Sequence, residues 1–369
     1  MSIDAIFDAH HWAAVPFHFW SVAFFICGSI VGSFLNVCIY RMPRNESVVA
    51  PPSHCPNCNY AIPFYLNIPL ATWIWLKGKC RNCGASISPR YFVVELLTGL
   101  AFLACWLGFG QKSAPLALVY CLVLSGFIVA TFIDFEHFII PDEITLGGIA
   151  AGFICSLLWP AVHRVQTSAM SIEQCFLGVL TGAGLVYGIL RLGKLLYGRQ
   201  KFQLAPESRV YFTETSVKLP DRDIPYEEIF YRRSDTIVLE ASTVELADRC
   251  YRNVPVRLSP HLLRIAGETF EPESVPYLEV VTDQIVVPRE AMGLGDVKFM
   301  AAIGAFLGWQ GVIFSLMISA VLGATVGISL ILLRKSEWSS RLPYGPYIAL
   351  AATIWIFAGQ QISTWWFLR

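Results

Sequence analysis

Long apolar segments recur along most of this chain, and they constrain its fold more than any other feature of the sequence. A helix that crosses a bilayer needs about 20 mostly apolar residues, because about 30 Å of hydrocarbon must be crossed at about 1.5 Å per residue. Eight segments meet or nearly meet this requirement, at residues 17–39, 92–110, 115–133, 143–162, 175–197, 297–309, 311–333 and 346–367. The sequence therefore predicts an all-α polytopic membrane protein with about eight transmembrane helices.

Charged residues are concentrated in one stretch between the apolar segments. Residues 199–290 hold 28 of the 54 charged side chains, 12 of them basic and 16 acidic. Alternating apolar runs at Arg209–Thr213, Thr236–Leu239 and Tyr277–Val281 favour β-strands. We therefore expect a small β-rich cytoplasmic insert, whose negative net charge is unlike that of a domain that binds anionic lipid.

The composition excludes two broad classes of function. With 55% hydrophobic residues, the chain is too apolar for a soluble enzyme. Its 27 basic and 27 acidic residues cancel, so it lacks the positive charge of a nucleic-acid-binding protein. We expect the lipid bilayer to be a partner of the chain, and nucleic acid not to be one.

The distribution of basic residues predicts an orientation, because loops rich in Lys and Arg stay in the cytoplasm. One set of loops offers little beyond Lys112, Arg164 and Arg369. The other set carries Arg41, Arg44, Lys77, Lys79, Arg81, Arg90, Arg191, Lys194, Arg199, Lys201, Arg334, Lys335 and Arg341. Both termini are therefore expected outside the cytoplasm. The expected domains are a first transmembrane helix (1–39), a cytoplasmic loop (40–91), helices two to five (92–198), the insert (199–290) and helices six to eight (291–369).

Four cysteines in the 40–91 loop form the pattern of a metal site. Cys55 and Cys58 make one Cys-x-x-Cys pair, and Cys80 and Cys83 make another after 21 further residues. This spacing is typical of four thiolates around one tetrahedral zinc, a structural site with no position open for water. Two disulfides are the alternative, but a cytoplasmic loop is kept reduced and the total of 11 cysteines is odd.

Two aspartates at the ends of apolar segments are candidates for catalysis. Asp134 follows the third segment, and Asp296 ends the sequence Gly293–Asp296 at the opening of the sixth. Two expected crossings separate them, so both should lie at one membrane face, where ionisable groups indicate function. Paired carboxylates share a proton, so one can activate water while the other stabilises the oxyanion of a peptide carbonyl. This is the chemistry of an aspartic protease.

Other interpretations of these acids remain open. Asp134 and Asp296 can instead cap their helices or lie in interfacial water. Asp142 is a second choice of catalytic partner, although its position is typical of a helix start. Asp134 can also form a metal site with Glu136 and His137.

Several motifs together resemble the type IV prepilin peptidase family, also called leader peptidase and N-methyltransferase, which consists of membrane aspartic peptidases. The motifs follow the order of the family along nearly the whole chain outside the insert, which is more specific than any single motif. The matching stretches are Gly32–Val37, Tyr40–Arg41, the paired cysteines ending in Cys83–Gly84, Ile87–Tyr91, Val94–Thr98, Ile133–Asp134, Pro141–Asp142, Gly293–Asp296 and Pro343–Tyr347.

The resemblance implies an inner-membrane aspartic endopeptidase that removes the short basic leader of prepilins or pseudopilins at the cytoplasmic face. It places the two catalytic aspartates on Asp134 and Asp296. It also implies methylation of the new N-terminus with S-adenosyl-L-methionine, an activity associated with the cysteine loop. Gly78 and Lys79 are our candidates for the methyl-donor pocket, although both are equally typical of turns in a zinc loop.

The insert departs from the usual family pattern, in which bacterial members commonly have a short connection at this position. It can gate access to Asp296, recruit secretion or pilus assembly components, or only extend the loop. Glu95 enters the second expected span near the same membrane face, and Lys298 lies two residues after Asp296. Either can position substrate or tune the two acids, although Lys298 can also simply extend to the membrane interface. The rival function is an ion- or proton-coupled transporter, or a pilus or secretion assembly factor without enzymatic activity.

Overall fold

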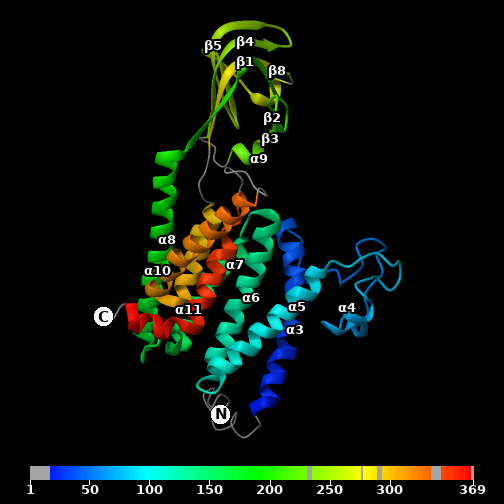
Figure 1. Cartoon of the computed structure of the whole chain (residues 1–369), viewed down its shortest axis with the longest axis vertical. Coiled ribbons are helices and arrows are strands. Elements are labelled where there is room, and N and C mark those ends of the chain that lie inside the picture. The colour runs from blue at the N-terminus through cyan, green and yellow to red at the C-terminus, as the bar shows by residue number, and fades with distance from the viewer. Residues whose placement is uncertain (1–16, 231–234, 276, 289–292, 334–341, 367–369) are drawn as a thin grey trace. The chain divides into compact units, whose positions relative to one another are not determined.

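The computed structural model describes residues 17–230, 235–275, 277–288, 293–333 and 342–366. Met1–Val186 with Leu294–Arg369 forms one compact unit, and Tyr187–Gly293 forms a second. Helices build the first unit, and an antiparallel sheet dominates the second (Figure 1). Four residues used for the predicted orientation, Arg334, Lys335, Arg341 and Arg369, lie outside the described residues, as does the predicted boundary between residues 290 and 291.

The long helices follow the apolar segments of the sequence. They are α3 (Phe17–Arg41), α5 (Pro89–Cys105), α6 (Ala114–His137), α7 (Asp142–Leu158), α8 (Ser168–Tyr197), α10 (Leu294–Leu332) and α11 (Gly345–Trp366). Local caps start two of them, since the Ser88 hydroxyl accepts from the Arg90 N–H and the Ser113 hydroxyl accepts from the Leu116 N–H. Each of these two helices also has a proline in its first turn, where a missing N–H costs no hydrogen bond.

Glycines allow close approach between helices of the first unit. A Cβ at Gly32 of α3 would lie 2.7 Å from the Cα of Glu95 in α5. A Cβ at Gly178 of α8 would overlap the carbonyl oxygen of Gly304 in α10. Small residues permit such packing where lipid gives no hydrophobic drive, so dispersion contacts hold these helices together.

The prediction of an all-α protein with about eight transmembrane helices is wrong. The described helices that are long and apolar enough to cross a membrane number five: His18–Arg44, Pro89–Gly110, Ala114–His137, Ser168–Leu195 and Leu294–Leu332. An eight-stranded sheet in the second unit excludes the all-α class. Three strands of this sheet contain most of the alternating runs, and alternate side chains of these runs face the buried core on one side of the sheet.

The helix count differs for identifiable reasons. The expected spans 297–309 and 311–333 both lie in α10, which counts as one candidate span although Gly308, with a φ of 68° and a ψ of 178°, is not helical and marks a kink between two helical parts. The expected span 143–162 is α7, whose 17 residues are short for a bilayer. The expected span 346–367 is α11, whose mean hydropathy is lowered by Gln360 and Gln361.

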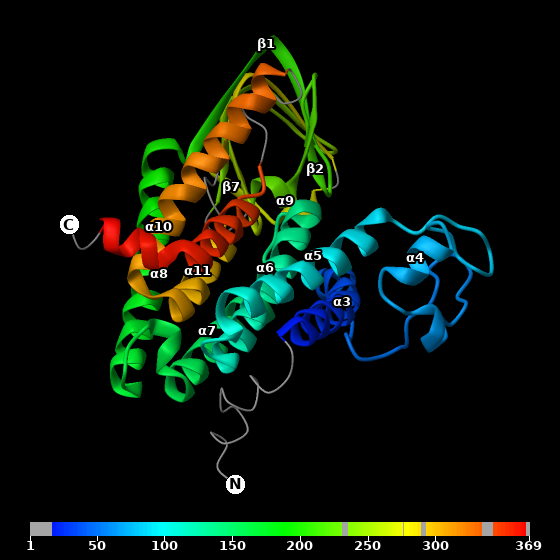
Figure 2. The same ribbon diagram turned by 60° about the horizontal axis from the view of Figure 1, so that its bottom comes forward.

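The loop between α3 and α5 contains short elements, namely η1 (Met42–Arg44), η2 (Phe64–Leu66) and α4 (Ala71–Trp75). Both views place this loop beside the ends of α3 and α5 (Figures 1 and 2). The buried Arg41 anchors its first part, because its guanidinium donates to the carbonyls of Ser47 and Pro51 at 2.8 and 2.6 Å. The loop is thus joined to the helices by more than its covalent ends.

The sheet of the second unit is antiparallel, with the strand order β3-β2-β1-β8-β4-β5-β6-β7. Its strands are β1 (Arg199–Phe212), β2 (Ser216–Lys218), β3 (Asp223–Pro225), β4 (Ile237–Leu246), β5 (Cys250–Ser259), β6 (Leu262–Ile265), β7 (Glu268–Phe270) and β8 (Leu278–Pro288), with α9 (Tyr226–Ile229) and η5 (Pro272–Ser274) in the connections. Alternate side chains, among them Val210, Leu239 and Val280, form one buried core.

The first residue of the first strand lies beside the last residue of the last strand. Arg199 at the start of β1 pairs with Pro288 at the end of β8. Paired residues of antiparallel strands have Cα atoms about 5 Å apart. The chain therefore enters and leaves the sheet at nearly the same point.

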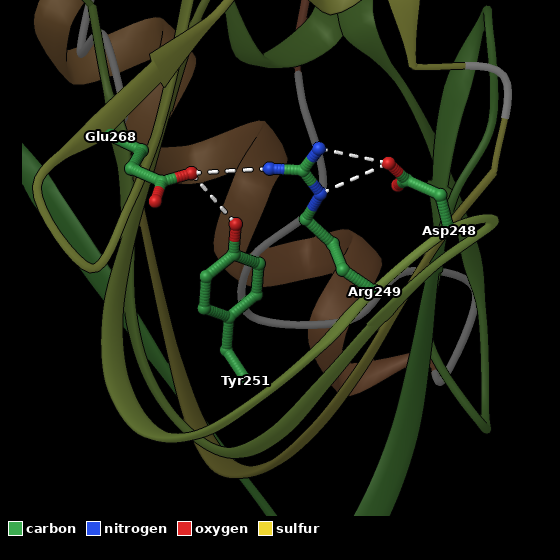
Figure 3. A network of polar contacts seen from close by, with 4 residues as sticks. All are labelled: Asp248, Arg249, Tyr251 and Glu268. Atoms are coloured by element: carbon green, nitrogen blue, oxygen red, sulfur yellow. Dashed lines mark hydrogen bonds and ion pairs between the residues drawn. The ribbon is translucent and has the colours of Figure 1, made fainter.

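A polar network joins the turn between β4 and β5 to β7 (Figure 3). Arg249 pairs with Asp248 at 2.9 Å and with Glu268 at 3.4 Å, and the Tyr251 hydroxyl donates to Glu268 at 2.8 Å. The charged groups are exposed, so these ion pairs contribute little to stability. They are typical of a solvated surface rather than of a site.

Candidate functional site

Asp134 is buried in the last turn of α6. The N–H of Gly345, 211 residues further along the chain, donates to its Oδ2 atom at 2.8 Å. A Cβ at Gly345 would lie 2.9 Å from the same oxygen, so glycine permits this close approach. The start of α11 therefore fixes the orientation of the Asp134 carboxylate.

Asp296 lies in the first turn of α10. Its neighbour Gly295 packs against Ile140, whose Cβ lies 3.5 Å from where a Cβ on Gly295 would be. The Cδ1 atom of the same Ile140 lies 3.2 Å from where a Cβ on Gly345 would be. The residue before Asp296 and the residue that binds Asp134 thus share one aliphatic neighbour, and the two segments meet there.

Tyr344 and Ser319 contribute polar groups that the sequence did not single out. Their hydroxyl oxygens lie 3.0 Å apart, and Ser319 is fully buried. The pKa of the Tyr344 phenol is raised, chiefly because the group is buried, although the hydrogen bond with Ser319 lowers it. Tyr344 directly precedes Gly345, whose N–H donates to Asp134. Its place in the Pro343–Tyr347 motif was the signal available in the sequence.

The alternative acid, Asp142, has a cationic partner. The Nζ atom of Lys298 donates to its Oδ1 atom at 2.6 Å, and both side chains are exposed. This ion pair connects the start of α7 to the start of α10, two residues after Asp296. Asp142 is a counter-ion for Lys298, whereas Asp134 is buried and held by a backbone N–H, which favours Asp134 as the partner of Asp296.

The structure gives no support to a metal site at Asp134, Glu136 and His137. Glu136 forms an ion pair with Arg90 at the start of α5, and His137 is exposed. In the described part of the chain, cysteines form the one group of three or more potential metal ligands. The Arg90–Glu136 pair instead joins the end of the cysteine loop to α6.

The four cysteines of the loop converge on one point. Their Sγ atoms all lie within 4.8 Å of one another, with 3.9 Å between Cys55 and Cys83 and 4.0 Å between Cys58 and Cys80. Tetrahedral zinc with bonds of about 2.3 Å needs sulfur atoms about 3.8 Å apart, whereas a disulfide needs about 2.0 Å. The donor set and its spacing therefore fit a zinc ion and do not fit two disulfides.

The two cysteine pairs lie in hairpins of the same local design. The Cys55 N–H donates to the Tyr60 carbonyl, and the Cys80 N–H, 25 residues later, donates to the Ala85 carbonyl. Each hairpin has one residue of positive φ directly after its second cysteine, 53° in the first hairpin and 72° in the second. The matching backbone bonds present each pair of Sγ atoms in the same way.

An asparagine from each hairpin crosses to a cysteine of the other. Asn57 Nδ2 donates to Cys83 Sγ, and Asn82 Nδ2 donates to Cys58 Sγ, each at 3.6 Å. The pKa of the Cys83 thiol is lowered to about 6, first by the hydrogen bond from the Ala85 backbone N–H and second by the one from the Asn57 side chain. Donors to sulfur favour the thiolate, which is the form that binds a metal.

Gly78 and Lys79 lie between α4 and the second hairpin. Gly78 has a φ of 66°, its carbonyl accepts from the Ile87 N–H at 2.7 Å, and the Trp73 ring covers it. Lys79 is exposed and pairs with Ser86 across the hairpin. These are the contacts of a turn, and a role of both residues in binding the methyl donor stays a prediction.

Two family models match the chain and together cover more than half of it. Residues 26–109, which contain the four cysteines, match the Bacterial Peptidase A24 N-terminal domain. Residues 121–202 and 274–328, which contain Asp134 and Asp296, match the Type IV leader peptidase family. The chain belongs to the type IV leader peptidase family. The resemblance seen in the sequence is thereby confirmed.

Curated relatives agree with this family over most of the chain. A prepilin leader peptidase/N-methyltransferase of Aeromonas hydrophila is 28% identical over an alignment of 377 positions, gaps included, which covers 95% of each chain. A protein of the same name from Myxococcus xanthus is 47% identical over 133 residues, 36% of this chain and 39% of that one. A type 4 prepilin-like proteins leader peptide-processing enzyme of Escherichia coli is 38% identical over 174 residues, 42% of this chain and 61% of that one. No solved structure matches the chain.

Proposed function

We propose that this family member is an aspartic endopeptidase that removes the basic leader of type IV prepilins or pseudopilins, with Asp134 and Asp296 as the catalytic pair. The observation that carries the proposal is the contact of Ile140 with both Gly295 and Gly345, because these glycines adjoin or bind the two acids. The names of the curated relatives support the class of substrate.

The proposed site of cleavage is the cytoplasmic face of the inner membrane. Five helices long and apolar enough to cross a bilayer support a membrane location. Basic residues in the loop between α3 and α5 support a cytoplasmic position for that loop, and Arg90 ties the loop to Glu136 near Asp134. At this face a prepilin leader stays in the cytoplasm beside the acids, while the apolar helix that follows the leader stays in lipid.

The chemistry follows from the surroundings of the two acids. The Gly345 N–H occupies the Oδ2 atom of Asp134, so Oδ1 accepts a proton from the attacking water, and Asp134 acts as the general base. Asp296 acts as the protonated partner that stabilises the developing oxyanion. Glycine at position 295 lets the substrate backbone come close to this second acid.

We further propose that the chain methylates the new N-terminal amine, as the names of its relatives indicate for them. S-adenosyl-L-methionine, when bound, supplies an electrophilic methyl group on a sulfonium. Cys55, Cys58, Cys80 and Cys83 hold a structural zinc that shapes the loop between α3 and α5, since four thiolates leave no open position on the metal.

Co-expression with a candidate prepilin, followed by mass measurement of the mature N-terminus, tests scission and methylation together. Asp134→Asn and Asp296→Asn should each lower cleavage roughly a thousandfold or more, because an amide cannot share the proton that the pair exchanges. Membrane fractionation should show that both variants are still inserted.

Asp142→Asn is the matched control for this experiment. It breaks an exposed ion pair with Lys298, so cleavage should fall by no more than about tenfold. Normal cleavage by either Asp134→Asn or Asp296→Asn contradicts the assignment of the catalytic pair. A chain without any processed prepilin, but with ion transport that collapses in these variants, fits the rival transporter function.

A further inference from the structure

A cavity of about 290 Å³ lies between α3 and the loop that follows it. Ser33, Phe34 and Arg41 line it from α3, and Val49, Asn67 and Pro69 line it from the loop. Pockets that bind small molecules start at about 300 Å³, so this cavity approaches their size. A second cavity, beside Gly308, measures about 50 Å³ and has room for only a few water molecules.

A buried acid lies directly behind the wall of the larger cavity. Glu95 of α5 is 8% exposed, its Oε2 atom accepts from the Leu70 N–H at 2.7 Å, and the Ser33 hydroxyl is within hydrogen-bonding reach. Both partners are neutral, and none of the ion pairs formed by described residues involves Glu95. A buried carboxylate without a cation is costly. Glu95 does not itself line the cavity, but Ser33 does, so a cation in the cavity would lie one residue away from the carboxylate and would offset part of this cost.

The backbone beside this acid is strained. Leu70 has a φ of 62° and a ψ of −53°, and the Ala71 N–H donates to the Pro69 carbonyl at 2.6 Å, which closes a γ-turn. A γ-turn with positive φ is rare for any residue other than glycine, and such strain persists where the surroundings enforce it, often at binding sites. Here the bond from Leu70 to Glu95 enforces it.

The cavity is also lined by a positively charged side chain. The buried guanidinium of Arg41 lines it, while Phe34 and Val49 give it apolar walls. A matching ligand carries a carboxylate, a cation and a flat apolar group. S-adenosyl-L-methionine has all three, in its amino-acid carboxylate, its sulfonium and its adenine.

One hydrophobic cluster connects the cavity to the helix that carries Asp134. Val48, which lines the cavity, packs against the cluster that includes Ile39, Val94 and Ile133. Ile133 directly precedes Asp134 in α6. The wall of the cavity and the residue before Asp134 therefore take part in the same hydrophobic cluster.

We infer that this cavity binds S-adenosyl-L-methionine, with Glu95 compensating the sulfonium and Arg41 compensating the carboxylate. The inference rests on the methyltransferase half of the proposed function and gives that activity a location. It differs from the sequence-based candidates Gly78 and Lys79, which line neither cavity.

The test compares binding of S-adenosyl-L-methionine and of S-adenosyl-L-homocysteine, its neutral thioether, to the purified full-length chain by equilibrium dialysis. Glu95→Gln keeps the acceptor for the Leu70 N–H but removes the charge. It should weaken binding of the methyl donor by on the order of tenfold and change binding of the thioether by less than about twofold. Glu173→Gln, which removes an exposed acid on α8, is the control and should change neither.

A second variant keeps the inference testable if Glu95→Gln is poorly folded. Val49→Trp places a large ring in the cavity from an exposed position, so it should weaken binding of both compounds. The inference is overturned if Val49→Trp binds both compounds as well as the wild-type chain does. It is also overturned if Glu95→Gln weakens binding of the two compounds equally. In either case the proposed methyl transfer itself stands. A wild-type chain that binds no donor and transfers no methyl group refutes both the inference and that half of the proposed function.

Discussion

We expect single hydrogen bonds to set how firmly the four cysteines of the loop hold the proposed zinc ion. Asn57→Ala removes the amide that donates to Cys83 Sγ, so the charge on that thiolate is less well stabilised. Partners outside the ligand shell typically change metal affinity about 10- to 100-fold, and we expect a loss in this range. Competition of the purified chain with a coloured chelator measures it. Ser86→Ala, an exposed change in the second hairpin, is the control, and equal zinc retention by both variants contradicts the role of Asn57.

At the same scale, the sequence singled out candidate acids, but it did not describe their surroundings. Asp134 was readable because a charged residue ends an apolar run, and the four cysteines were readable from their spacing. The hydrogen bond from Gly345 was not readable, because it joins residues 211 positions apart and its donor is a backbone N–H. The pairing of Asp142 with Lys298 was hidden for the same reason, since it depends on how α7 and α10 pack.

Among the helices, the contact between α8 and α10 depends on the absence of a side chain at Gly178. Gly178→Ala would push a methyl group into the Gly304 carbonyl, so it should destabilise the bundle by about 1–3 kcal/mol. Thermal unfolding in detergent should show a lower midpoint. Gly184→Ala on the same helix meets open space, so helix propensity should leave its midpoint unchanged or higher. Equal midpoints for the two variants would contradict this packing.

The limits of the sequence at the scale of elements are also physical. Apolar runs marked where helices lie, but they did not show that the two parts of α10 are joined directly by a kink at Gly308, because a glycine between two apolar runs is equally typical of a loop. Alternation marked β1, β4 and β8 as strands. It did not show that β8, the last strand, lies between β1 and β4, because strand order depends on pairing between distant segments.

For the whole molecule, the sheet is expected to be separable from the peptidase. Replacing residues 200–287 by a short Gly-Ser linker should give a chain that still inserts and still cleaves a co-expressed prepilin. The reason is that Arg199 and Pro288 are paired neighbours, so a few residues bridge the roughly 5 Å between them. Mass measurement of the prepilin N-terminus reports the outcome. A variant that inserts normally but leaves the prepilin uncut would show that the sheet is needed for catalysis.

The pairing of β1 with β8 also bears on how such chains diversify. A sheet that meets the rest of the chain at a single joint can be acquired or discarded by changing the length of one connection, and no membrane helix has to move. The match to the Type IV leader peptidase family agrees with this, since it stops at residue 202 and resumes at residue 274. Relatives can therefore carry attachments of different length at this position without any change in the order of their membrane helices.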